Sequence, residues 1–176
     1  GGNFISDGKG TCYLTTTVFE RNPHSSEAQI RSYLDRYLGC AQSVFLEPLY
    51  GEGTGHIDMF AKFVSPTTVL VGEYDPRFDP DNAAILDRNV ERILALNEEG
   101  ANLRVVRIPM PPAMGDVYRS YTNSTIFNNR VIVPVYPADT RYQSVALAAY
   151  RQAVPPGYEI VTIKADQAIQ FGGAVH

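Results

Sequence analysis

Apolar and polar positions along the chain follow two alternating periods, and the same order of periods occurs three times. Each time, two short segments with a period near two precede a segment with a period near 3.6, and a short apolar segment follows. This order predicts two strands, a helix and a strand. The three units occupy approximately residues 1–50, 51–110 and 111–176. Tandem ββαβ units favour an α/β repeat or propeller over a doubly wound sheet, with a generic α/β sandwich as the alternative.

The first unit predicts strands at residues 3–5 and 11–17, a helix, and a strand at residues 44–46. Ser26 and Gln29 have the spacing of a capping box, so the helix is expected to begin after Ser26. Gly39 is expected to end it. The apolar stripe of this helix consists of Ile30, Tyr33, Leu34, Tyr37 and Leu38.

The second unit predicts strands at residues 56–64, 68–73 and 103–108, with a turn at residues 65–67. Asp79 is the expected N-cap of its helix and Pro80 the first helical residue. The apolar stripe of this helix consists of Ile85, Leu86, Val90, Ile93 and Leu94, with Leu96 as a possible extension.

The third unit predicts strands at residues 120–127, 130–135 and 158–163. Asn128-Asn129 suits a turn with positive φ between the first two strands. Asp139 is the expected cap of the helix that precedes the last strand. That helix carries Tyr142, Val145, Ala146, Ala149 and Tyr150 on its apolar stripe.

Composition places the chain among soluble globular proteins, with 44% hydrophobic and 19% charged residues. The net charge of −4 argues against a protein that binds nucleic acid. No apolar run has the length of a membrane span. The chain opens on Gly1-Gly2 without a methionine, so the compartment, cytoplasmic or exported, is left open. Cys12 and Cys40 are expected to be structural thiols, since two cysteines and three scattered histidines do not suggest a zinc site.

Candidate chemistry centres on His56 and Asp58, which follow the glycine-rich residues 51–55. In a strand, residues two apart lie on the same face. The carboxylate can bind a cation, and the imidazole can transfer protons near neutral pH. Alternatively, both side chains satisfy local backbone groups. Asn123 offers an amide to a polar ligand, or it simply begins a solvated hairpin.

Four motifs resemble one family: Gly1-Gly2-Asn3-Phe4, Gly55 to Ala61 (Gly-His-Ile-Asp-Met-Phe-Ala), Arg119 to Asn123 (Arg-Ser-Tyr-Thr-Asn) and Gly172 to His176 (Gly-Gly-Ala-Val-His). Their order and spacing resemble those of bacterial Porphyromonas-type peptidylarginine deiminases and agmatine deiminases, which are guanidine-modifying enzymes. The resemblance implies a pentein-type α/β propeller with about three of its five blades present. It also implies that the chain is an internal segment whose partner is the remainder of a parent deiminase.

The resemblance implies hydrolysis of a small-molecule or peptide guanidinium to a ureido group and ammonia, without metal or organic cofactor. A cysteine thiolate forms a thiouronium intermediate. His56 is the implied general acid/base, Asp58 the guanidinium clamp, and Asn123 and Gly173 further substrate contacts. The nucleophile is expected directly after His176, so the isolated chain is expected to be inactive. An amidinotransferase, a non-catalytic guanidine-binding module and a purely structural domain are the alternatives.

The substrate class depends on the run before the histidine. The usual agmatine deiminase run is Asp-x-x-Asp-Gly-His-Val-Asp-Asn. Residues Glu52 to Met59 lack its second acid and its final Asn, which favours a peptidylarginine-type or other guanidine substrate over agmatine. The oligomeric state is not predicted.

Overall fold

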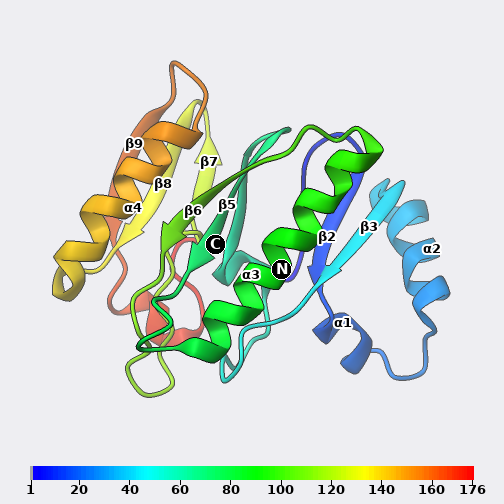
Figure 1. Ribbon diagram of the computed structural model, residues 1–176, viewed down its shortest axis with the longest axis horizontal. Coiled ribbons are helices and arrows are strands. Elements are labelled where there is room, and N and C mark those ends of the chain that lie inside the picture. Colours follow the sequence, from blue (N-terminus) through cyan, green and yellow to red (C-terminus); the bar gives the residue numbers. More distant parts are fainter. Residues whose placement is uncertain (1) are drawn as a thin grey trace.

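The computed structural model describes residues 2–176 as three small sheets side by side, each accompanied by a helix (Figure 1). Each sheet contains three strands in chain order. The first two strands are antiparallel, and the second and third are parallel. A helix connects the second strand to the third in every sheet. The α/β class and the repeated ββαβ order predicted from the sequence are therefore confirmed.

The elements of the first sheet are β1 (Ile5–Ser6), β2 (Thr11–Thr15), α1 (Thr17–Glu20), α2 (Glu27–Leu38) and β3 (Gln42–Leu46). The second contains β4 (Ala61–Ser65), β5 (Thr68–Glu73), α3 (Pro80–Ala95) and β6 (Arg104–Pro109). The third contains β7 (Thr125–Phe127), β8 (Arg130–Val135), α4 (Thr140–Ala153) and β9 (Glu159–Lys164). Four 3-10 turns complete the chain: η1 (Ile57–Met59), η2 (Leu96–Glu99), η3 (Pro137–Asp139) and η4 (Ala168–Phe171).

Helix ends follow the sequence signals where the capping chemistry is local. Ser26 and Gln29 form the complete capping box of α2, and Gly39 ends that helix in the left-handed region. Asp79 caps α3, with Pro80 at its first position. Asp139 precedes α4 as predicted but makes no cap, because its carboxylate pairs with Arg119 instead.

Two predicted strands begin too early. Residues 56–60 are not strand: Phe60 N donates to Ile57 O (3.0 Å) and closes the turn η1, and strand β4 begins only at Ala61. Residues 120–124 are a buried loop rather than strand, because their polar groups bond to each other and to tyrosine hydroxyls. Both corrections fall on segments that carry candidate functional residues. The turn at Asn128-Asn129 has the predicted positive φ, 48° and 58°.

One apolar core runs through all three sheets and includes Tyr13, Leu70 and Val133. A smaller cluster lies between the first sheet and α2. There Cys12 and Cys40 form a disulfide, so the expectation of two free structural thiols is wrong. The α2 stripe is correct at only two of its five positions: Ile30 and Leu34 are buried, whereas the two tyrosines and Leu38 are exposed.

Helix α3 buries two asparagines that the apolar stripe did not indicate. Asn82 Oδ1 accepts from Tyr50 N (2.7 Å), and its amide nitrogen donates to Tyr50 O (3.2 Å). Asn89 makes the same pair of bonds with Glu47 N and O (both 2.8 Å). The two side chains are seven residues apart and therefore share one face of the helix. They fasten the connection that leads from β3 toward residue 56.

Candidate active site

Asp58 lies in η1, where main-chain contacts from distant segments hold it. Its N–H donates to Gly2 O (3.1 Å), and its carbonyl accepts from Thr122 Oγ1 (3.0 Å). The residue is only 3% exposed. A carboxylate that is removed from water is costly unless it is paired, so its partners decide what it can do.

The two oxygens of Asp58 have different surroundings. Oδ2 accepts from Asn123 Nδ2 (2.9 Å) and lies 2.7 Å from His176 Nδ1. Oδ1 is buried, and no residue between 2 and 176 donates a hydrogen bond to it. An unsatisfied buried acceptor costs about 1–3 kcal/mol. Oδ2 therefore has two partners, whereas Oδ1 has none among the described residues.

Burial dominates the electrostatics of the site. Desolvation raises the pKa of Asp58, and the hydrogen bond from His176 and the nearby His56 and Lys62 oppose that rise. Desolvation also lowers the pKa of Lys62, and the negative charge of Asp58 opposes that decrease. Burial thus disfavours the charged form of both Asp58 and Lys62.

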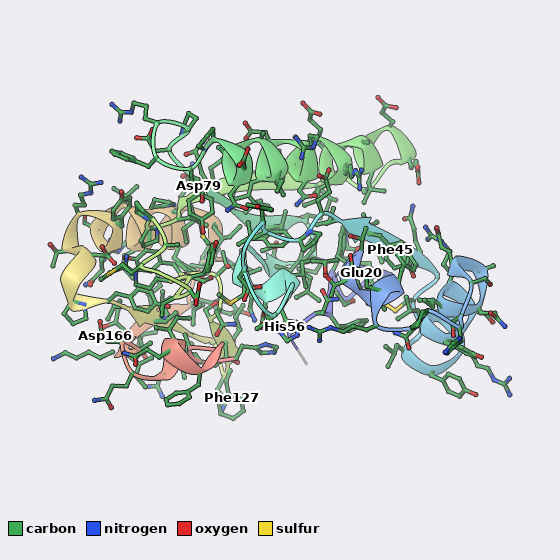
Figure 2. The ribbon with its side chains drawn as sticks, turned by 90° about the horizontal axis from the view of Figure 1, so that it is seen from below. Glu20, Phe45, His56, Asp79, Phe127 and Asp166 are labelled. Carbon is green, nitrogen blue, oxygen red and sulfur yellow. A yellow bond between two sulfur atoms is a disulfide. The ribbon has the colours of Figure 1, made fainter. Side chains whose placement is uncertain are left out.

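His56 comes to the same place as Asp58, although the two do not share a strand face. His56 is the extended residue before η1, and Figure 2 labels it between η4 and α1. An ideal Cβ on Gly2 would lie 2.6 Å from His56 Nδ1 and 2.7 Å from each oxygen of Asp58. The imidazole and the carboxylate thus border one small volume that only a glycine backbone can approach this closely.

The loop of residues 51–55 delivers His56 to this position. The Glu52 carboxylate accepts from Thr54 N (3.0 Å) and Gly55 N (2.7 Å), so it is folded onto its own loop. Arg21 donates to Thr54 O (2.7 Å) from the first unit. Gly55 has a φ of +64°, a conformation that favours glycine. The loop is therefore ordered by its own contacts.

The structure brings Asp58 and Asn123 into direct contact and places His56 beside Asp58. Gly173 lies in the turn after η4, and an ideal Cβ on it would be 3.0 Å from His176 O. The sequence reasoning did not identify His176 as the partner of Asp58. The only available signal was the Gly-Gly-x-x-His motif itself, because the two residues are 118 positions apart.

Among residues 2–176, no group of three or more His, Cys, Asp or Glu side chains is arranged to hold a metal ion. No helix in that part of the chain has the length and apolarity that crossing a membrane requires.

Comparisons with known proteins identify relatives of this chain. A putative agmatine deiminase of Legionella pneumophila (strain Paris) is 34% identical over all of this chain and 53% of its own length. The crystal structure of a putative arginine deiminase from Porphyromonas gingivalis matches with a TM-score of 0.87 at 29% identity, over 100% of this chain and 54% of its own.

An agmatine deiminase variant of C. jejuni with substrate bound has the same fold, with a TM-score of 0.79 at 20% identity over 100% of this chain and 53% of its own. The chain thus spans about half the length of these relatives. The sequence profile of the Porphyromonas-type peptidyl-arginine deiminases matches residues 1–176, and the chain therefore belongs to that family.

Proposed function

We propose that this chain forms part of a guanidine deiminase, which hydrolyses a guanidinium group to a ureido group and ammonia. The observation that supports this most is the buried Asp58, whose Oδ1 has no partner among residues 2–176 and which lies beside His56. A guanidinium is a planar cation that presents only N–H donors. It matches an anionic acceptor in a dry site better than a neutral ligand does.

In the proposed reaction, a thiolate on the residue after His176 attacks the guanidinium carbon, and the C–N bond to the departing nitrogen breaks. His56 gives a proton to that nitrogen, which leaves as ammonia. His56 then takes a proton from water, whose oxygen attacks the thiouronium carbon. Collapse of this adduct breaks the C–S bond and returns the thiolate, and the product loses its O–H proton to solvent and becomes the neutral ureido group. Asp58 balances the positive charge throughout.

The contacts of Glu52 support one substrate class. With Glu52 bonded to Thr54 and Gly55, the loop before His56 offers no free carboxylate from that residue to an ammonium group. This supports a peptidyl-arginine substrate over agmatine, which carries a second cation. Gly173 is proposed to lie against the substrate, because a glycine there lets the backbone approach it.

The test uses the full-length encoded protein with agmatine and with a peptide that ends in arginine. Ammonia release and ureido formation are measured for the wild type, His56→Gln and Asp58→Asn. His24→Gln is the matched control, because His24 is exposed in a turn. Both site variants should lose turnover by at least about 10²-fold, the usual scale for a general acid/base, whereas the control keeps it. Turnover that persists in both site variants contradicts the proposal, and binding without turnover in the wild type favours a binding module.

A further inference from the structure

Asn123 makes an unusual set of contacts with the segment that ends at His176. Its side-chain oxygen accepts from three successive backbone N–H groups, those of Ala174 (2.7 Å), Val175 (3.1 Å) and His176 (3.1 Å). Its nitrogen donates to Asp58 Oδ2 (2.9 Å). One amide therefore connects the candidate carboxylate to a three-residue turn more than fifty positions away in the sequence.

The loop that carries Asn123 leaves the side chain little freedom. Asn123 is 1% exposed, and its N–H donates to Ser120 Oγ (3.2 Å). Tyr136 OH donates to Ser120 O (2.9 Å), and Tyr150 OH donates to Tyr121 O (2.8 Å). The hydroxyl groups of two core tyrosines thus fix the main chain of this loop by hydrogen bonds. A side chain fixed in this way can hold other groups in place with little entropic cost.

The hydrogen-bonding capacity of Asn123 argues against a direct contact with a guanidinium. A guanidinium only donates, and the single acceptor atom of an asparagine side chain is its oxygen. In Asn123 that oxygen already serves three N–H groups. To bind the substrate cation, Asn123 would have to release the turn at residues 174–176.

We infer that Asn123 is a positioning residue that fixes residues 174–176 relative to Asp58, rather than a substrate ligand. The inference deepens the proposed function, because the reacting thiolate there follows His176. His176 completes the arrangement, since its ring and Asn123 share Asp58 Oδ2. The amide thereby sets the separation between the carboxylate that receives the substrate and the backbone that presents the nucleophile.

The first test is hydrogen–deuterium exchange of the amides at residues 174–176 in the full-length protein, a measurement that requires no turnover. Asn123→Ala removes the shared acceptor, so exchange at these amides should become at least about tenfold faster. Ser124→Ala removes a neighbouring buried hydroxyl of the same loop but leaves the Asn123 amide, so it should retain most of the protection. Equal exchange in wild type and Asn123→Ala, or equally fast exchange in both variants, overturns the inference.

The second test separates positioning from substrate binding. In Asn123→Ala, kcat should fall by about 10²-fold with little change in KM, as expected when a reacting group is misplaced by about 1 Å. A raised KM with an unchanged kcat would identify a substrate ligand and refute the inference. Gln152→Ala is the control, because it removes an exposed side-chain amide from helix α4 and should leave kcat, KM and exchange at 174–176 unchanged. If wild type shows no guanidine hydrolysis, the proposed function fails, while the exchange result still decides this inference.

Discussion

Replacing Gly2 by alanine tests how closely the backbone must approach the candidate site. The added Cβ would lie 2.6 Å from His56 Nδ1 and 2.7 Å from both oxygens of Asp58. Ordinary contact begins at 3.4 Å, so the deficit is 3.4 − 2.6 = 0.8 Å toward the imidazole and 3.4 − 2.7 = 0.7 Å toward the carboxylate. A shift of the Gly2 backbone away from these atoms would break the hydrogen bond that its carbonyl accepts from Asp58 N (3.1 Å).

The expected cost to stability is that of overpacking, about 1–3 kcal/mol. A displacement of this size at the reacting groups should lower kcat/KM by about 10- to 100-fold, since 1 Å of misplacement can cost 10²-fold. The assay combines urea unfolding with steady-state ammonia release. Gly53→Ala is the control: no atom lies within 4 Å of its ideal Cβ, and its φ is not in the left-handed region. Full activity and full stability of Gly2→Ala would refute the argument that a glycine is needed beside His56 and Asp58.

Three further predictions concern stability. Asp58→Asn should abolish turnover yet raise Tm by a few degrees at about pH 8, because burial raises the pKa of Asp58 and its charged form is disfavoured in the folded protein. This gain in Tm should shrink as the pH falls through the raised pKa of Asp58 toward the ordinary value of 3.8, since the carboxyl of the wild type then takes up a proton. A gain in Tm that grows on acidification contradicts the argument. Asn89→Ala should lower the free energy of unfolding by about 2–4 kcal/mol in urea, because Glu47 N and O lose their buried partners, and a change below about 0.5 kcal/mol would refute this. The disulfide Cys12–Cys40 joins residues 28 positions apart, so its reduction should lower the free energy of unfolding by about 3–4 kcal/mol. Thermal unfolding with and without reductant measures this loss. Reductant should not change the stability of the double serine variant.

Local chemistry explains which parts of the fold the sequence predicted. The capping box at Ser26 and Gln29 and the Asp79-Pro80 start need only residues within one helical turn. The strand order within each unit likewise follows from periodicity. Asp139 shows the limit, because a buried arginine twenty positions away competes for its carboxylate and removes the cap.

The candidate site was only partly predictable for the same reason. His56 and Asp58 were found from their spacing, but the strand that was meant to pair them is a 3-10 turn. Gly2 comes next to both of them through tertiary packing, and His176 reaches Asp58 across 118 residues. The buried Asn82 and Asn89 were missed because a hydrophobic stripe does not show amides that bond to a neighbouring main chain.

The hydrogen bonds around Asp58 join positions 64, 65 and 118 apart in the sequence, whereas the strand pairs of each sheet join positions at most 36 apart. Contacts between distant positions bear the greater loop-closure entropy and form late in folding. Each sheet with its helix can therefore acquire structure before the site exists. On partial unfolding we expect the reverse order, in which the segment at residues 174–176 detaches while the sheets persist. A chain with native-like ellipticity would then already lack an organised carboxylate–imidazole pair.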